Sequence, residues 1–376
     1  MNRIKPNTCY SFNHKYLARK LICLMRFSIA WVFALSLLIF ACSPTLQSDS
    51  SSAVSEQGGV PVEQMDWSIV IHGGAGHFDS ESYTSEQEAE YRRNLSAAID
   101  VGKAILSSGG SSADAVQAAI VVLEDCPLFN AGKGAVFTAE GINEMDASFM
   151  DGTTLNCGAV TGIQRVKNPI KAARGVMTES EHVFFSGKGA TAFAEKLGLE
   201  LVDSSYFKTD KAWNRYLNIK AKEESSVLVL EKPDKYGTVG CVALDQNGDI
   251  CAGTSTGGMT WKRNGRIGDS PVISAGTYAD SDVGGVSCTG HGEYFIRAAV
   301  AHDIIARSAY KEISMTVAAE EVVMDKLIDM GGEGGVIGLD KYGRPVMVFN
   351  STGMFRGYAN SDGEQDVLLY GPYESN

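Results

Sequence analysis

The sequence has few of the side chains on which hydrolases and metalloproteins most often depend. Only five histidines follow residue 41, and no Gly-x-Ser-x-Gly segment or other convincing Ser, His and Asp set occurs, so a serine-hydrolase triad has no visible support. The five cysteines beyond residue 42 include no Cys-x-x-Cys pair and no metal-like spacing, which argues against a zinc or redox centre. Any catalytic activity must therefore rest on other groups.

Positive charge is also scarce once the N-terminal segment is set aside. Six of the 33 Lys and Arg residues lie within residues 1–41, which leaves 27 basic residues against 45 acidic residues and a net charge near −18. Nucleic acid and anionic lipid are both bound through basic patches. We therefore expect this protein to bind neither of them through charge.

Long hydrophobic runs are absent except for one near the N-terminus. The apolar run 27–41 is about 15 residues long, shorter than the roughly 20 that span a membrane but typical of a signal peptide. It ends in Ile39-Phe40-Ala41-Cys42-Ser43, which resembles a bacterial lipobox. We expect a signal peptide and lipobox over residues 1–42, a flexible tether over 43–65, and an exported, periplasmic lipoprotein held at the membrane only by its lipid anchor. A plain cleaved signal peptide and a buried helix remain alternatives.

Hydrophobic periodicity from Trp67 onward predicts both helices and short strands. Helices cluster between groups of short strands joined by tight turns, which favours antiparallel sheets covered by helices, an α+β fold, over a regular βαβ alternation. Helices are expected at 82–107, 113–123, 169–177, 190–197, 206–224, 292–309 and 316–330, and strands at 68–72, 134–138, 147–150, 158–161, 238–244, 250–255, 283–288, 335–339 and 345–349.

Side-chain spacing gives two more local predictions. The apolar side of helix 82–107 is expected to contain Ala97, Ile99, Val101, Ala104 and Ile105. The Asn-Gly pair at 247–248 predicts a two-residue hairpin turn with Leu244 opposite Cys251. In that register Cys241 points to the other face of the sheet, so the two cysteines cannot form a disulfide and are expected to be buried thiols.

Glycines and hydroxyl residues crowd together in two segments. The first, GTVGCVALDQNGDICAGTSTGGMTWKRNGRIGDSP (237–271), has more glycine, threonine and serine at its strand ends than a hairpin needs. The second, SCTGHGE (287–293), stands at the entrance to a helix, where N–H groups favour negative charge. Such glycines let backbone N–H groups approach a ligand, while Arg266 and Asp269 could bind a carboxylate and an amine. The two segments together form a candidate site, although Arg266 and Asp269 could also be an ordinary surface pair.

Thr238 is the candidate nucleophile of this site. A threonine hydroxyl has too high a pKa to attack an amide unaided, so a base must lie beside it. If the chain breaks before Thr238, the new α-amine, with a pKa of about 7.7–8.0 in reference peptides, becomes that base. Gly237 suits the break, because glycine tolerates a strained backbone that exposes its carbonyl group. On local grounds alone, a strand residue without a chemical role is the alternative.

Seven ordered motifs carry a resemblance to a known family. From about Ile69 to Phe355 the chain resembles the plant-type asparaginases and isoaspartyl peptidases, which are Ntn-hydrolases with an N-terminal threonine nucleophile. The motifs are IHGGAG (71–76), LEDCPLFNAGKGAVFT (123–138), MDASFMDG (145–152), GTVG (237–240), TSTGG (254–258), GRIGDSP (265–271) and CTGHGE (288–293).

The resemblance implies a fold, a maturation and a reaction. The implied fold is a four-layer αββα sandwich with two antiparallel sheets between helical layers. Autocatalytic cleavage at Gly237–Thr238 would divide one folded domain into an α subunit (66–237) and a β subunit (238–376), which assemble as (αβ)2. The implied reaction is hydrolysis of small-molecule substrates, namely β-aspartyl (isoaspartyl) dipeptides and L-asparagine, without a cofactor for catalysis.

The same resemblance assigns roles to individual residues. Asp146 and Asp151 receive no such role and are expected to be structural. The implied roles are nucleophile for Thr238, support of the nucleophile for Thr256, oxyanion hole for Thr289 and Gly290, binding of the substrate α-carboxylate for Arg266, and binding of its α-amine for Asp269 and Gly292. The segment 123–133 resembles a loop that binds a structural Na⁺ through oxygen atoms, which suit a hard cation. The implied ligands are the backbone carbonyls of Leu123, Glu124, Cys126, Phe129, Ala131 and Lys133.

Three other functions remain open. The segment 182–192 imitates a dinucleotide-binding fingerprint, but Asp203 follows Gly189 by about 14 residues where about 20 are usual. A non-catalytic binding lipoprotein would remain one intact chain. Glycosylasparaginases, which act on N-glycosyl asparagine, typically have Asp-Thr at the cleavage point and a TGxGD motif, whereas this chain has Gly237-Thr238 and ends the corresponding motif in Glu293. Those differences favour the asparaginase and isoaspartyl peptidase members.

Overall fold

The structure is a computed structural model that describes residues 63–224 and 235–371. The expected signal peptide and lipobox, and nearly all of the expected tether, lie outside these residues. Within the described part of the chain, no helix is both long enough and apolar enough to cross a membrane.

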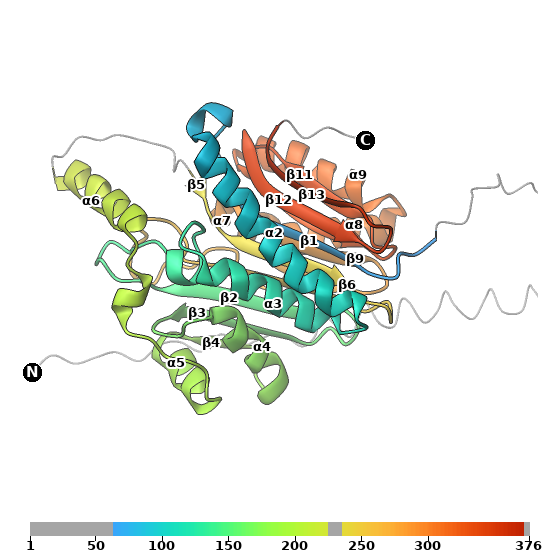
Figure 1. Ribbon diagram of the computed structural model, residues 1–376, viewed down its shortest axis with the longest axis horizontal. Helices are drawn as coiled ribbons and strands as arrows, with labels where there is room; N and C mark the ends of the chain where they lie inside the picture. The colour runs from blue at the N-terminus through green and yellow to red at the C-terminus, as the bar shows by residue number, and fades with distance from the viewer. Residues whose placement is uncertain (1–62, 225–234, 372–376) are drawn as a thin grey trace, which may run out of the picture. The chain divides into compact units, whose positions relative to one another are not determined.

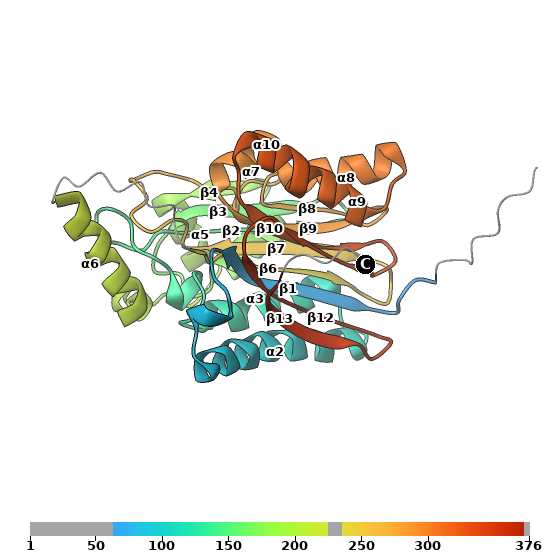
Figure 2. The same cartoon turned by 90° about the horizontal axis from the view of Figure 1, so that it is seen from above.

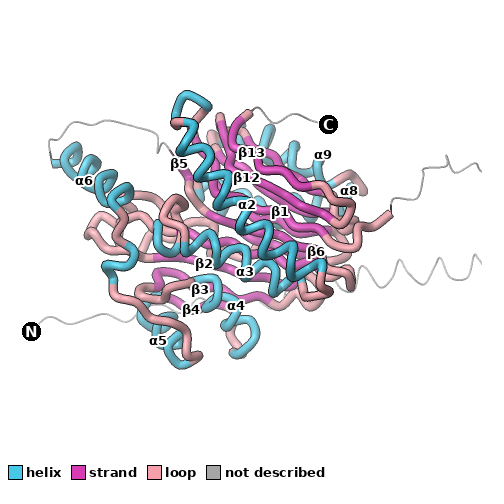
Figure 3. Tube along the Cα trace, in the orientation of Figure 1, coloured by secondary structure: helices cyan, strands magenta, loops and turns pink. Residues whose placement is uncertain are grey.

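Nine strands of the described residues form one large sheet (Figures 1 and 3). Its order is β13-β12-β1-β6-β7-β2-β3-β4, and β5 also pairs with β1. All pairs are antiparallel except β3 and β4, which are parallel. The bounds are β1 (Ser68–Gly76), β2 (Met145–Asp151), β3 (Cys157–Ile163), β4 (Phe184–Ser186), β5 (Lys235–Tyr236), β6 (Val239–Leu244), β7 (Ile250–Thr256), β12 (Gly353–Asn360) and β13 (Gln365–Tyr370).

A second, smaller antiparallel sheet has the order β11-β10-β9-β8. Its strands β9 and β10 pack against β6, β7 and β1 of the large sheet, so the two sheets lie face to face. A layer of aliphatic side chains, including Val70, Val242 and Ile337, fills the space between them. The bounds are β8 (Thr277–Asp280), β9 (Gly284–Gly290), β10 (Gly334–Asp340) and β11 (Pro345–Phe349).

Helices cover the outer face of each sheet (Figure 2). On the large sheet, α2, α3 and α4 bury one core, and on the small sheet α8 and α9 bury another. These four layers confirm the predicted α+β fold and αββα sandwich. The helices are α2 (Ser85–Ser107), α3 (Ser112–Asp125), α4 (Pro169–Glu179), α5 (Gly187–Lys196), α6 (Asp210–Glu224), α7 (Gly292–Ala298), α8 (Val300–Lys311), α9 (Met315–Glu320) and α10 (Leu327–Met330), with a π-helical turn at Glu321–Lys326.

Several predicted boundaries were wrong for physical reasons. Strand β1 does not stop at its glycines, because Ala75 and Gly76 still pair with β12 after a bulge between His72 and Gly74. The predicted helix 292–309 breaks at Ala299, which has a left-handed backbone (φ 50°). The break occurs where the N–H groups of Ala301 and His302 donate to the carbonyls of Ala275 and Ser274 instead of continuing the helix. Residues 134–138 do not form the predicted strand; a 3-10 turn at Gly132–Gly134 leads into them.

Other strands were missed altogether. The sequence patterns did not predict β4, β5, β8, β12 or β13. The strand β12 lies beside β1 in the large sheet and supplies one side of its pairing.

The predicted apolar side of α2 was only partly right, since Ile99 is buried but other members are not. Of its members, Ala97, Val101 and Ala104 are exposed, with Val101 at 39% of its full exposure. The buried face includes Gly102, which packs so closely on β1 that a Cβ there would lie 2.2 Å from Ile69 Cδ1. The buried residues are Tyr91, Leu95, Ala98, Ile99, Gly102 and Leu106.

The two cysteines of the β6–β7 hairpin are free and buried, as predicted, but the predicted register was wrong. Leu244 pairs with Ile250, and Ala243 pairs with Cys251. Cys241 is two residues from Ala243, so both cysteines lie on the same face of the sheet and in the same core. The register shifts because the hairpin closes through Asp245, which accepts from Gly248 N and donates to the Asp249 carbonyl.

Candidate active site

Three strand ends bring the predicted threonines to one place. Thr238 precedes β6, Thr256 ends the antiparallel neighbour β7, and Thr289 lies near the end of β9 in the facing sheet. All three are buried, with 7%, 2% and 0% of their surface exposed. The site therefore lies between the two sheets at one end of the sandwich.

The hydroxyl group of Thr238 has a defined partner. Thr238 Oγ1 donates to Thr256 Oγ1 at 3.0 Å, and the same Thr256 oxygen accepts from Gly258 N at 3.0 Å. The Gly258 N–H thus fixes Thr256, and Thr256 in turn fixes the hydroxyl of Thr238. This geometry brings together the two residues that the sequence predicted as nucleophile and support.

His72, to which no role was assigned from the sequence, holds the main chain of Thr238. Its Nδ1 lies 3.0 Å from the Thr238 carbonyl oxygen, and its Nε2 lies 3.0 Å from Ser287 Oγ. A carbonyl can only accept, so Nδ1 carries the proton and Nε2 accepts from Ser287. Burial lowers the pKa of His72 to about 3, which keeps the ring neutral and this tautomer in place.

The hydrogen bonds continue from Ser287 through a series of buried hydroxyls, here called the hydroxyl chain (Ser287, Thr254, Thr277 and Ser148). Ser287 and Thr254 oxygens lie 2.7 Å apart, Thr254 and Thr277 oxygens 2.5 Å apart, and Ser148 Oγ lies 2.7 Å from Thr277. The members lie on β9, β7, β8 and β2. The carbonyl of Thr238 is thus tied, through His72, to five strands in both sheets.

Gly240, the second glycine of GTVG, leaves the room that this arrangement needs. A Cβ at position 240 would lie 2.0 Å from Ser287 Oγ and 2.4 Å from His72 Nε2. Any side chain there would push apart the histidine and the serine. The requirement for glycine comes from this close approach, since Gly240 is not among the residues with a left-handed backbone.

The carbonyl group of the Gly237–Thr238 bond is held by Asn130. The backbone N–H of Asn130 donates to Gly237 O at 3.0 Å. A Cβ on Gly237 would lie 2.6 Å from Asn130 Cβ, so glycine is needed for proximity and not for the strained backbone that the sequence suggested. The side chain of Asn130 accepts from Val136 N and donates to Gly258 O, at 3.0 and 2.7 Å.

Arg266 is held by a carboxylate of the protein. Its Nε and Nη2 each donate to Glu293, at 3.0 Å, and His291 Nε2 lies 3.2 Å from the same carboxylate. Hydrogen bonds from His291 and Arg266 keep the pKa of Glu293 well below its usual range. Arg266 and Asp269 therefore do not form the simple surface pair considered above, and His291 contacts Glu293.

The third guanidinium nitrogen of Arg266 faces glycines. A Cβ would lie 3.5 Å from Nη1 if built on Gly258, and 2.9 Å from it if built on Gly268. The same Cβ on Gly258 would lie 3.0 Å from Lys262 Cδ and Nζ, so Nη1 and the Lys262 side chain both face Gly258, the residue that also fixes Thr256. A substrate carboxylate bound at Nη1 would lie on the Thr256 side of Arg266.

Asp269 lies buried against Gly292, the other residue predicted to bind the α-amine. A Cβ on Gly292 would come within 2.9 Å of Asp269 N and Oδ1. Burial raises the pKa of Asp269 to about 7, and its Oδ2 has no hydrogen-bond partner among the described residues. A buried carboxylate in this condition is stabilised by a cation, such as a substrate ammonium group.

Thr289 and Gly290, the predicted oxyanion hole, lie at the end of β9. Thr289 Oγ1 accepts from Ala75 N at 3.3 Å. Gly290 is enclosed, since a Cβ there would lie 2.6 Å from both Glu333 O and the Phe295 ring. The strand end is therefore held by β1 on one side and by α7 on the other.

The aspartates expected to be structural have structural partners. Asp146 Oδ1 accepts from Thr161 Oγ1 at 2.6 Å and from Gly162 N at 2.9 Å, and Asp151 Oδ1 accepts from Thr153 N at 2.8 Å. Within the described part of the chain, no cluster of His, Cys, Asp or Glu side chains could hold a metal ion.

The glycines of the dinucleotide-like segment start α5. Gly187 has a left-handed backbone (φ 52°) and follows β4, a three-residue strand at the edge of the large sheet. Asp203 caps a 3-10 turn by accepting from Ser205 N at 2.9 Å. These residues serve as turn and capping groups in the fold.

Comparison with known proteins identifies the family of the chain. A family model described as asparaginase matches residues 65–369. The chain is 47% identical over 298 residues to the isoaspartyl peptidase of Escherichia coli (strain K12), covering 77% of this chain and 92% of that protein. It is 39% identical over 290 residues to the isoaspartyl peptidase/L-asparaginase of Homo sapiens, covering 76% of this chain and 91% of that protein. The family match includes every residue placed at the site above, and the chain belongs to the asparaginase family.

Proposed function

We propose that this protein cleaves itself between Gly237 and Thr238 and then uses Thr238 to hydrolyse β-aspartyl dipeptides and L-asparagine. The observation that carries the proposal is the placement of Thr238. Its hydroxyl is oriented by Thr256 at 3.0 Å, while the carbonyl of the bond to be broken is held by Asn130 N at 3.0 Å. Relatives named isoaspartyl peptidase and isoaspartyl peptidase/L-asparaginase support the choice of substrates.

Self-cleavage would begin with attack of Thr238 Oγ1 on the carbonyl carbon of Gly237. An ester bond forms to Oγ1, the bond between Gly237 and Thr238 N breaks, and the hydroxyl proton passes to the released amine. The N–H of Asn130 stabilises the negative charge that develops on the Gly237 oxygen. Water then hydrolyses the ester, which leaves a Gly237 carboxylate and a Thr238 with a free α-amine.

Substrate hydrolysis would use the new α-amine as the base. The amine takes the proton of Thr238 Oγ1 as this oxygen attacks the side-chain carbonyl of the aspartyl group. Thr289 and Gly290 bind the oxyanion, the amine or ammonia leaves with a proton, and water releases aspartate from the acyl-enzyme. Arg266 binds the α-carboxylate, and Asp269 with Gly292 binds the α-amine. These steps need no cofactor.

The test is the Thr238→Ala variant, compared with the wild type by mass spectrometry and by assays on asparagine, β-Asp-Leu and N-glycosyl asparagine. The wild type should give two fragments split at Gly237–Thr238 and should hydrolyse the first two substrates. The variant should remain one inactive chain. Cleavage of the variant would refute Thr238 as nucleophile, and exclusive hydrolysis of N-glycosyl asparagine would identify a glycosylasparaginase instead.

We also propose a structural Na⁺ held by the carbonyls of Leu123, Glu124, Cys126, Phe129, Ala131 and Lys133. The loop fits such a site because it folds back on the end of α3. A Cβ on Gly132 would lie 2.4 Å from Glu124 O, and one on Gly134 would lie 1.9 Å from Phe129 O. Replacement of Na⁺ by choline should lower the melting temperature, and an unchanged value would exclude the site.

Export, lipidation at Cys42 and an (αβ)2 assembly are proposed on the sequence and the family resemblance alone. A Cys42→Ser variant should lose incorporation of labelled fatty acid and move from the membrane fraction to the periplasm. Light scattering of the cleaved protein should give twice the mass of one chain. Membrane retention of the variant, or a single-chain mass, would refute the respective proposal.

A further inference from the structure

A pocket lies beside Gly237, outside the group of residues that would bind the aspartyl part of a substrate. It encloses about 580 Å³ of empty space, part of which is open solvent. Gly74, Ala75, Asn130 and Gly237 line it, whereas Arg266 and Asp269 do not. The pocket thus adjoins the bond to be broken at Thr238, and the charged anchors of the aspartyl group are elsewhere.

Two contacts favour this pocket as the place for the leaving group of a substrate. Ala75 N donates to Thr289 Oγ1 at 3.3 Å, so the pocket wall contacts the residue that would bind the oxyanion. Arg266, by contrast, adjoins Gly258, which fixes Thr256. A substrate anchored at Arg266 and Asp269 with its carbonyl at Thr238 would extend its leaving group away from those anchors and toward Ala75 and Gly237.

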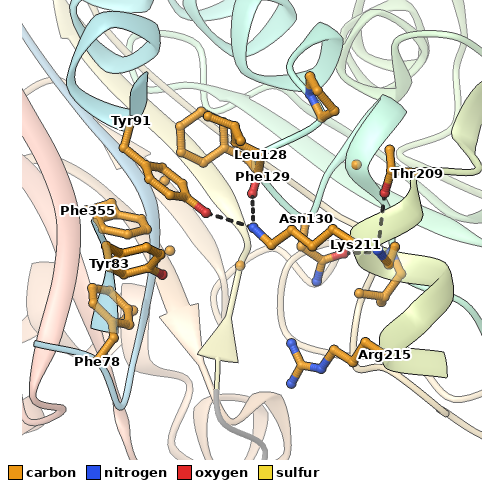
Figure 4. Close-up of a pocket in the computed structure, with 18 residues that line it drawn as sticks. Phe78, Tyr83, Tyr91, Leu128, Phe129, Asn130, Thr209, Lys211, Arg215 and Phe355 are labelled. Atoms are coloured by element: carbon orange, nitrogen blue, oxygen red, sulfur yellow. Dashed lines mark hydrogen bonds between the residues drawn. The ribbon is translucent and has the colours of Figure 1, made fainter. Parts of the chain in front are cut away.

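One wall of the pocket consists of four aromatic rings (Figure 4). The ring centroids of Tyr91 and Phe355 lie 4.4 Å apart, those of Phe78 and Phe355 lie 4.5 Å apart, and those of Tyr83 and Tyr91 lie 5.2 Å apart. Three of the rings lie within residues 78–91 and the fourth lies on β12. Their contacts join them into one surface, here called the aromatic wall (Phe78, Tyr83, Tyr91 and Phe355). Such a surface is suited to an apolar side chain.

The opposite wall is cationic. Lys211 and Arg215, one helical turn apart on α6, line the pocket and extend from the helix toward the aromatic wall (Figure 4). Lys211 Nζ donates to Tyr91 OH at 2.7 Å and to Leu128 O at 3.0 Å, which fixes it across one end of the pocket. Arg215, half-buried, presents a planar guanidinium group that suits a carboxylate.

An amino acid with an apolar side chain has the two groups that these walls would bind. In a β-aspartyl dipeptide the residue that leaves carries a free α-carboxylate and its own side chain. Ammonia, which leaves from asparagine, carries neither. The pocket can therefore affect the hydrolysis of the dipeptide without affecting that of asparagine.

We propose that this pocket is the subsite for the leaving residue, with the aromatic wall binding an apolar side chain and Arg215 binding the free α-carboxylate. The proposal rests on the function proposed above, since it assigns the specificity of the same site. It makes the protein selective for β-aspartyl dipeptides that end in a large apolar residue.

The test compares ratios of kcat/KM on fully cleaved enzyme. In Arg215→Gln, the ratio of β-Asp-Leu to asparagine should fall about tenfold, as expected for loss of a charge-assisted hydrogen bond. The wild type should prefer β-Asp-Leu to its C-terminal amide, and Arg215→Gln should lose this preference while Arg215→Lys keeps part of it. Lys220→Gln removes the same charge from a half-exposed side chain of α6 that does not line the pocket, and it is the matched control, for which both ratios should match the wild type.

A second variant tests the aromatic wall. Phe78→Ala should lower the ratio of β-Asp-Leu to β-Asp-Gly, because only the leucine side chain reaches the wall. If the enzyme hydrolyses asparagine and dipeptides but both variants keep wild-type ratios, the subsite is refuted and the function stands. If the wild type neither cleaves itself nor hydrolyses asparagine, the proposed function itself fails.

Discussion

Asp269 should make the hydrolysis of asparagine depend steeply on pH. Burial raises the pKa of its carboxyl to about 7 in the unliganded protein, and only the ionised form can bind the substrate ammonium group. The ionised fraction falls from about one half at pH 7 to about one tenth at pH 6, so kcat/KM should fall about fivefold through this group alone. The value of kcat/KM for asparagine therefore decreases as pH falls through 7.

The α-amine of Thr238 complicates a simple pH profile, because it must also be unprotonated and has a reference pKa of about 7.7–8.0. Succinamate separates the two effects. It has the same amide and carboxylate as asparagine but no α-amine, so its hydrolysis needs the Thr238 amine but not an ionised Asp269. The ratio of kcat/KM for asparagine to that for succinamate should therefore fall about fivefold between pH 7 and 6, and nearly tenfold for each further unit.

The assay is steady-state hydrolysis of both substrates from pH 5 to 8, at constant ionic strength. Asp269→Asn should make the ratio independent of pH, since the amide does not titrate. A constant ratio in the wild type over this range would refute the assignment of Asp269 to the α-amine. A ratio that varies equally in wild type and variant would assign the pH dependence to another group.

Two further predictions concern residues that support the site. Gly240→Ala should lower the free energy of unfolding by about 2–4 kcal/mol, from overpacking and the loss of the His72–Ser287 hydrogen bond, and should slow self-cleavage. The control is Gly189→Ala, because a Cβ at position 189 would meet no atom within 4 Å. Equal stability of the two variants in urea would contradict the packing argument. Burial raises the pKa of Glu124 from 4.5 to about 8, so the folded chain keeps a proton that the unfolded chain loses, and stability should fall as pH rises from about 5 to 8. In the uncleaved Thr238→Ala background, Glu124→Gln should reduce the pH dependence of the free energy of unfolding. The substitution Glu200→Gln, at an exposed position, should leave that dependence unchanged. An unchanged pH dependence in Glu124→Gln would show that Glu124 ionises normally.

The chemistry of the site was easier to predict than the contacts that hold it. Thr238, Thr256 and Arg266 stand in local patterns of glycine and hydroxyl residues, so the sequence singles them out as candidates. His72 and Asn130 act on Thr238 and Gly237 from more than 100 residues away, and no local pattern encodes such contacts. Even the IHGGAG motif revealed only that a strand meets glycines, whereas the position of His72 depends on how the two sheets pack.

The errors in the predicted fold also come from contacts between distant segments. The Asn-Gly pair predicted a turn between β6 and β7 correctly, but the register depends on Asp245, whose side chain also accepts from Ser112 N at the start of α3. The helix 292–309 has good helical periodicity throughout, and it breaks only where backbone groups of the loop before β8 accept its N–H groups. In both places a contact between distant segments overrides a local preference.

The hydroxyl chain behind Thr238 makes self-cleavage depend on correct assembly of the two sheets. His72 lies on the large sheet and Ser287 on the small one, so the hydrogen bonds that hold the Thr238 carbonyl are complete only when the two sheets have docked. A misassembled chain would then keep its peptide bond and remain inert. If cleavage occurs as proposed, it acts as a checkpoint on folding, because only a correctly assembled chain would gain the new N-terminus and become active.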